Sequence, residues 1–320
     1  MINRSSTYHY FSLVALCIAF FLVYLIIYES KKQSFSFALL NNYYMLNYRL
    51  GGNFMTTKIL ACDLDGTLIK YNDGPDQPRS VLEADKQAIT DYMNEGNIYI
   101  VSTGRASEIT FPLFDRIELN LTNAYYITSN GSEIFDKERK CIYRSRIKQE
   151  KIYDIYQLYL EFNINDTLDI ELYNGIKRFT SKDIQESKDL EMINPLINVC
   201  VASKNSSIDE SRPFYEKAKE VFKDLTITMN NWYVDLVPMN TSKAIAIQFI
   251  LDKEQLTKEN LYAVGDSWND VSMFEIAKVS YTFNNSPKDV IMKADKSIDH
   301  LHECIYDILN KESLNNKEER

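Results

Sequence analysis

The body of the chain alternates short apolar runs with longer stretches in which apolar residues recur at helical spacing. The short runs are typical of buried strands and the longer stretches of helices, so we expect an α/β fold: a doubly wound parallel sheet with helices on both faces. The expected elements are strands 59–62, 98–102, 124–128 and 261–264, helices 81–94, 106–117, 241–251 and 302–310, and a small hairpin of 133–135 with 141–143.

The pattern changes between residues 146 and 238, which predicts an inserted α/β cap domain. The catalytic core would then consist of residues 55–145 and 239–310, and residues 311–320 would form a charged tail. A cap in this position can close over the crevice and exclude bulk water. Its expected elements are helix 149–162, strands 167–172 and 176–180, a helix from Lys182 onward, strand 197–202, helix 208–222, and strands 225–230 and 232–237.

Residues 1–54 form an apolar segment that allows two interpretations. The run 11–27 is just long enough to span a bilayer, and Lys31 and Lys32 follow it, which favours a single-pass anchor with a cytoplasmic catalytic domain. Alternatively, translation begins at Met55, directly ahead of the first expected strand, and the segment before it is not part of the native protein. Leu50, Gly51 and Gly52 can be encoded by a purine-rich ribosome-binding sequence, which favours this second interpretation and a cytoplasmic enzyme.

The most informative motif is Asp63-Leu64-Asp65-Gly66-Thr67, directly after the apolar run 59–62. Carboxylates spaced by one residue at a strand end point to the same side, so both can face one bound group. Gly66 permits a tight turn and close approach to a ligand, and the Thr67 hydroxyl can brace the loop. A carboxylate can attack a phosphoryl group while a second acts as general acid and base, although a strand followed by a polar turn would explain the same residues.

Polar residues follow further strands and open one helix. Each has a simpler interpretation: Lys243 as a surface charge, Thr103 as a helix cap, Asn130-Gly131 as a hairpin turn, and Asp270 as a helix cap. Their joint occurrence at strand ends favours a shared site. The candidates are Thr103, Gly104 and Arg105 after the strand 98–102, Asn130 after 124–128, Lys243 at the start of the helix 241–251, and Asp266, Asn269 and Asp270 after 261–264.

With these motifs the chain resembles the haloacid dehalogenase superfamily, and within it the Cof-like branch of magnesium-dependent phosphatases, subfamily IIB. The resemblance covers residues 55 to about 309 and implies a Rossmann-like core with an α/β cap. It implies that Asp63 is the nucleophile and Asp65 the general acid and base. It further implies that Thr103 and Lys243 bind and stabilise phosphate. The Mg²⁺ ligands would be Asp63, Asp266 and the carbonyl of Asp65. Asn269 would touch the substrate, and Asp270 would support the metal site.

The composition of the chain limits the classes of partner, compartment and metal that can be expected. With 45 acidic and 36 basic residues, the formal net charge is −9, which disfavours binding to nucleic acid. The five cysteines are scattered without paired spacing, which fits a reducing compartment. His300 and His302 have no further histidine or paired cysteine nearby, so a zinc site is not expected.

The expected activity is magnesium-dependent hydrolysis of small phosphorylated metabolites, such as sugar phosphates, through an aspartyl-phosphate intermediate. A phosphotransferase or phosphomutase would use the same nucleophile and remains an alternative. A membrane-tethered, non-catalytic binding module is a further alternative, which the complete set of reactive residues disfavours. The residues of the cap that choose the substrate cannot be identified from one sequence.

Overall fold

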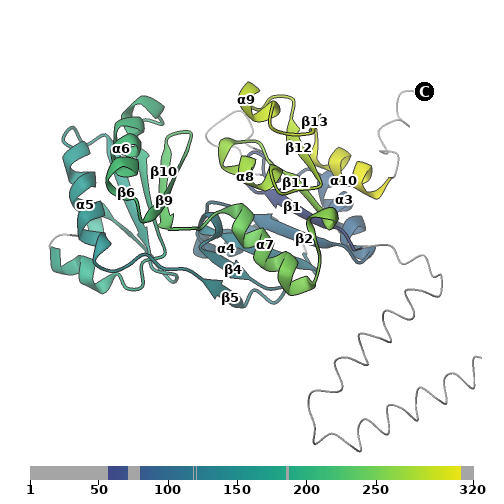
Figure 1. Ribbon diagram of the computed structural model, residues 1–320, viewed down its shortest axis with the longest axis horizontal. Coiled ribbons are helices and arrows are strands. Elements are labelled where there is room, and N and C mark those ends of the chain that lie inside the picture. Colours follow the sequence, from purple (N-terminus) through teal and green to yellow (C-terminus); the bar gives the residue numbers. More distant parts are fainter. Residues whose placement is uncertain (1–56, 71–79, 118, 120, 185–186, 311–320) are drawn as a thin grey trace, which may run out of the picture. The chain divides into compact units, whose positions relative to one another are not determined.

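The computed structural model describes residues 57–70, 80–117, 119, 121–184 and 187–310. In this part of the chain there are two β-sheets, one of eight strands and one of five (Figure 1). The eight-stranded sheet takes its strands from the beginning and the end of the described chain, and the five-stranded sheet from the residues between them.

The eight-stranded sheet has the order β13-β12-β11-β1-β2-β3-β4-β5. Neighbours from β13 to β3 are parallel, and β4 and β5 add an antiparallel edge. Strand β1 lies between β11 and β2, where the order of the strands reverses, and ligands of such sheets bind at this point. The strands are β1 (Ile59–Asp63), β2 (Ile98–Ser102), β3 (Ala124–Thr128), β4 (Glu133–Phe135), β5 (Cys141–Arg144), β11 (Leu261–Val264), β12 (Val279–Phe283) and β13 (Lys296–Ile298).

Helices cover both faces of this sheet because side chains alternate along each buried strand. In β1, Leu60 and Cys62 join an apolar cluster with α3, α4 and α10, whereas Ile59 and Ala61 join a second cluster with α7, α8 and α9. Burying one such side chain contributes about 1.5–3 kcal/mol to stability. The helices are α3 (Glu83–Asn94), α4 (Ser107–Ile117), α7 (Lys243–Glu254), α8 (Val271–Phe274), α9 (Lys288–Ile291) and α10 (Leu301–Leu309).

The five-stranded sheet has the order β7-β6-β8-β10-β9, with antiparallel neighbours throughout. One face packs against α5 and α6 in a third apolar cluster. The opposite face carries the alternate, mostly polar side chains. The elements are α5 (Lys151–Phe162), β6 (Leu168–Tyr173), β7 (Arg178–Thr180), β8 (Asn198–Ser203), α6 (Ile208–Val221), β9 (Leu225–Asn230) and β10 (Tyr233–Pro238).

The predicted fold class and most predicted elements are confirmed, with boundaries shifted by at most three residues. The helix predicted from Lys182 onward is wrong, because the described residues of this segment form short 3-10 helices instead: η2 (Ser181–Asp183) and η3 (Ser187–Met192). The Asp183 carboxylate accepts hydrogen bonds from the backbone N–H and the hydroxyl of Thr180, which closes one turn. Ile184 then adopts extended backbone and is buried, so the turn does not continue.

The N-terminal apolar run 11–27 lies outside the described residues. Within the residues that the structure does describe, no helix has the length and apolar character needed to cross a bilayer.

Candidate active site

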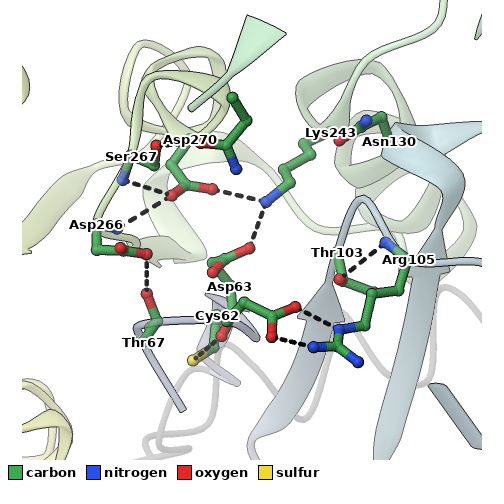
Figure 2. A network of polar contacts seen from close by, with 12 residues as sticks. Cys62, Asp63, Thr67, Thr103, Arg105, Asn130, Lys243, Asp266, Ser267 and Asp270 are labelled. Carbon is green, nitrogen blue, oxygen red and sulfur yellow. Dashed lines mark hydrogen bonds and ion pairs between the residues drawn. The ribbon is translucent and has the colours of Figure 1, made fainter. Parts of the chain in front are cut away.

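Three strand ends bring the candidate residues together at one edge of the parallel sheet. Strand β1 ends at Asp63, which is paired in register with Ser102 at the end of β2. On its other side β1 pairs with β11, which ends at Val264, just before Gly265 and Asp266. Arg105 and Asp266, which lie some 40 and 200 positions further along the chain, therefore meet around Asp63, as Figure 2 shows.

Lys243 lies between two buried carboxylates. Its Nζ donates to Asp63 Oδ1 at 2.6 Å and to Asp270 Oδ1 at 2.7 Å (Figure 2). The lysine is 1% exposed, Asp63 5% and Asp270 fully buried. The Ser242 hydroxyl caps α7 by accepting the N–H of Ile245, so the helix begins at the residue that carries the ammonium. Lys243 is therefore no surface charge.

Asp63, Asp266 and Asp270 form an acidic cluster. One carboxylate oxygen from each lies within 4.8 Å of the others. The Thr67 hydroxyl donates to Asp266 Oδ1 at 3.0 Å. Thr67 therefore braces the loop after β1, as expected, and it does so by a hydrogen bond to the loop after β11. The second oxygen of Asp270 accepts the backbone N–H groups of Asp266 and Ser267, each at 3.0 Å. Both oxygens of Asp270 are thus engaged, and it shapes the loop that presents Asp266.

The charges of this cluster do not balance. Burial, then the nearby Asp270 carboxylate, raise the pKa of Asp63 well above its usual range, although Lys243 opposes the shift. The same two causes raise the pKa of Asp266 to about 6. Burial alone would lower the pKa of Lys243, but Asp270 and Asp63 outweigh it and raise the value. Three carboxylates around one ammonium leave excess negative charge, and oxygen ligands of this kind suit a hard divalent cation.

Asp65 and Arg105 form an ion pair that the sequence did not suggest. The guanidinium Nε and Nη2 of Arg105 each donate to one oxygen of the Asp65 carboxylate. The two side chains are partly buried, with 27% of Asp65 and 17% of Arg105 exposed. The Asp65 carboxylate is therefore turned toward the loop after β2, and it is not part of the acidic cluster.

Thr103, Gly104 and Asn130 make a second wall of the site. The Thr103 hydroxyl accepts the N–H of Arg105 at 3.1 Å, and its carbonyl accepts the N–H of Asn130 at the same distance. A Cβ on Gly104 would lie 3.2 Å from Asn130 Oδ1. Asn130 has a positive φ of 52°, as a turn requires, and a Cβ on Gly131 would lie 2.4 Å from the carbonyl oxygen of Ser242. The turn therefore packs directly against the start of α7.

The five-stranded sheet contributes two residues that sequence reasoning missed. Asp235 in β10 accepts a hydrogen bond from Asn130 Nδ2 at 2.8 Å, and Asn230 in β9 accepts one from the Ser267 hydroxyl at 2.6 Å. Burial raises the pKa of Asp235 to about 6, and hydrogen bonds from Asn198 and Asn130 reduce the shift. Polar residues are frequent throughout 146–238, so the sequence held no signal for these two.

Asn269, the remaining candidate, lies in the short 3-10 helix η5 (Trp268–Asp270) directly after Asp266. Its side-chain oxygen is buried and has no hydrogen-bond partner among the described residues. The position of Asn269 in this loop brings it near the acidic cluster.

A family model, that of the haloacid dehalogenase-like hydrolases, matches residues 60–307. The match spans nearly all of the described chain, including both sheets and each of the site residues above. The chain belongs to the haloacid dehalogenase-like hydrolase family.

The individual relatives have low sequence identity to this chain, but they match it over most of their length and most of its own. Phosphatase YwpJ of Bacillus subtilis is 24% identical over 278 residues, which cover 74% of this chain and 93% of the relative. A second Bacillus subtilis protein, 5-amino-6-(5-phospho-D-ribitylamino)uracil phosphatase YcsE, is 24% identical over 241 residues, covering 74% and 88%. A crystal structure of a haloacid dehalogenase-like hydrolase from Bacteroides thetaiotaomicron superposes with a TM-score of 0.64 at 19% identity, covering 79% of this chain and all of that one, so the two share a fold.

Proposed function

We propose that the protein is a magnesium-dependent phosphatase that hydrolyses small phosphorylated metabolites through an aspartyl-phosphate on Asp63. The observation that carries this proposal is the placement of Asp63, whose carboxylate accepts a hydrogen bond from Lys243 at the carboxyl end of the sheet and lies in the acidic cluster with Asp266 and Asp270. The names of the relatives support the reaction class, and one of them acts, by its name, on a phosphorylated ribityl compound.

In the first half of the reaction, an oxygen of the Asp63 carboxylate forms a bond to phosphorus as the bond between phosphorus and the leaving oxygen breaks. Lys243 holds Asp63 Oδ1 at 2.6 Å, which orients the carboxylate for attack. Its ammonium and the Thr103 hydroxyl stabilise the charge that spreads over the phosphoryl oxygens. In the second half, water attacks the aspartyl-phosphate, which releases inorganic phosphate and restores Asp63.

Asp65 is the general acid and base of this proposal, and its ion pair with Arg105 must open first. A guanidinium binds phosphate in the same two-pronged way as carboxylate. A substrate phosphate therefore competes for Arg105 and frees the Asp65 carboxylate, which takes up a proton from solvent and then donates it to the leaving oxygen. Asp65 then takes the proton from the attacking water.

Asp63 and Asp266, with the carbonyl of Asp65, would hold Mg²⁺, and Asp270 would support them. These residues suit a divalent cation because three carboxylates are clustered there and carry excess negative charge. When bound, magnesium cancels the repulsion between the anionic nucleophile and the phosphate dianion and orients both. Asn269 lies in the same loop, its buried amide oxygen has no hydrogen-bond partner among the described residues, and in this proposal it would contact the substrate.

The proposal predicts release of inorganic phosphate from p-nitrophenyl phosphate and from a panel of sugar monophosphates by the purified full-length protein. The activity should require added magnesium and disappear on chelation. Asp266→Asn should raise the magnesium concentration needed for half-maximal rate, since it removes one metal-binding carboxylate, whereas Asn in place of the exposed Asp299 should not. Transfer of the phosphoryl group to an organic acceptor without phosphate release would instead establish a phosphotransferase.

Gly66 provides a second prediction with a matched control. A Cβ on Gly66 would lie 2.3 Å from Asp266 Oδ2, so Gly66→Ala must displace the metal-binding carboxylate and is expected to reduce kcat/KM about a hundredfold. Gly96 has nearly the same φ, +82° against +85°, but apart from its two neighbours in sequence no atom of the described residues lies within 4 Å of the added carbon. Gly96→Ala should therefore lose only about 1 kcal/mol of stability. Equal kinetics in the two variants would show that the close approach to Asp266 is unimportant.

A further inference from the structure

Lys70 lies at the end of the turn that follows β1, and its ammonium holds that turn closed. Its Nζ donates to the carbonyl oxygen of Gly66 at 2.8 Å. The same ammonium lies over the ring of Phe283, 3.4 Å from the ring centroid, and Phe283 is only 1% exposed. A carbonyl oxygen and an aromatic face both attract an ammonium, so Lys70 is held on two sides.

The carbonyl that accepts from Lys70 belongs to the peptide group that joins Gly66 to Thr67. Both of these residues contact Asp266, the Thr67 hydroxyl by donating to Oδ1 at 3.0 Å (Figure 2). The other carboxylate oxygen of Asp266 lies against Gly66, since a Cβ there would be 2.3 Å from Oδ2. The N–H of Gly66 donates to the carbonyl of Ile69 at 2.9 Å, which fixes the preceding peptide group as well. The position of the Asp266 carboxylate therefore depends on the peptide group that Lys70 holds.

The charge of Lys70 and its hydrogen bond should have opposite effects on a metal at this site. Burial lowers the pKa of Lys70, and the charge of Asp266 is the largest effect that opposes the shift, so the two side chains interact. An ammonium beside a metal-binding carboxylate repels a divalent cation, which weakens metal binding. The hydrogen bond to Gly66 instead keeps the carboxylate in place before the metal arrives, which strengthens binding. The direction of the change in affinity when Lys70 is replaced therefore separates the two effects.

We propose that Lys70 is a positioning residue of the metal site, which holds the peptide group after Gly66 so that the Asp266 carboxylate is in place for Mg²⁺. This inference rests on the proposed function, in which Asp266 is a metal ligand, and adds to it the residue that orients this ligand. Lys70 acts through the peptide group alone, and it makes no bond to the metal or to phosphorus.

The test measures magnesium binding by isothermal titration calorimetry, with the full-length protein freed of metal by chelation and dialysis. Lys70→Met keeps a long side chain that packs on the ring of Phe283, but it cannot donate to Gly66. The dissociation constant for magnesium should rise about tenfold in this variant, the lower end of the usual loss when an outer partner of a metal ligand is removed. Lys70→Arg can still donate to the carbonyl and stack on the ring, so its dissociation constant should stay within about threefold of the wild-type value.

Lys58→Met is the matched control. Lys58 also donates from Nζ to a backbone carbonyl, that of Ile308, but it directly precedes β1 and so lies at the end of the strand away from the site. This variant should lose some stability in thermal unfolding, because it loses a hydrogen bond of the same kind, and should bind magnesium as the wild type does. The control therefore separates a general loss of stability from a displaced metal ligand.

An unchanged or smaller dissociation constant in Lys70→Met would overturn the inference, and so would an equal rise in Lys58→Met or in Lys70→Arg. If thermal unfolding shows that Lys70→Met has lost its fold, Lys70→Leu takes its place with the same expectation. Phosphate release by the wild type is measured separately, so a protein that binds magnesium without hydrolysing any ester refutes the proposed function alone. A wild type that binds no magnesium refutes both.

Discussion

Asp63→Asn is expected to abolish phosphate release while leaving the protein folded. The amide cannot act as the nucleophile, so the rate should fall by about 10⁴-fold or more. The fold should persist because Lys243 keeps its 2.7 Å hydrogen bond to Asp270. Burial penalises the ionised form of Asp63, as its raised pKa shows, so the melting temperature should equal or exceed that of the wild type.

The rate is measured as inorganic phosphate released from the best substrate of the panel, and stability by thermal unfolding without added metal. Asp154→Asn, a change of the same type at an exposed position in α5, is the control and should behave as the wild type. Retention of more than about one hundredth of the wild-type rate in Asp63→Asn would exclude Asp63 as the nucleophile.

Lys243→Met is expected to have the second largest effect, and here activity and stability should both fall. Lys243 is the cation between two buried carboxylates, and removing one partner of a buried ion pair costs about 3–5 kcal/mol. The loss of charge stabilisation at the phosphoryl group should lower kcat by about 10²–10³-fold. Chemical denaturation and steady-state kinetics measure the two effects.

Two further variants separate the causes. Lys253→Met changes an exposed lysine in the last turn of the same helix and should leave both measurements near the wild-type values. The double variant Lys243→Met/Asp270→Asn removes one of the stranded carboxylates, so it should regain part of the lost stability without regaining activity. If Lys243→Met were as stable as Lys253→Met, the buried ion pairs would not be holding this part of the fold together.

The residues that meet at the sheet edge were predictable because of a geometric rule. Parallel strands that lie side by side end at the same edge, so polar residues after β1, β2 and β11 had to converge. Asp63, Asp266 and Lys243 could therefore be proposed from strand ends and one helix start. Their roles remain proposals, and the ion pairs of Lys243 are the structural observation that supports them.

Other features were not predictable, for two physical reasons. The pairing of Asp65 with Arg105 depends on which way two side chains turn, and spacing does not determine this. Asn230 and Asp235 belong to an antiparallel sheet whose register brings distant positions together, and nothing in a single polar residue identifies the face or neighbour it will have. The wrong helix from Lys182 has a local cause, since the hydrogen bonds from Thr180 to Asp183 close one turn and the chain then leaves helical geometry.

The chain passes between the two sheets twice, once just after Ser145 and once just before Ser242. Gly131 packs tightly against the Ser242 carbonyl, and the carbonyl of the next residue, Ser132, accepts the N–H of Ser145, so the two crossings lie close together. An insertion whose ends lie side by side can be exchanged or remodelled without moving the strands that flank it. Over evolution, the segment between these crossings can therefore diversify while the strands that carry the proposed site are inherited unchanged.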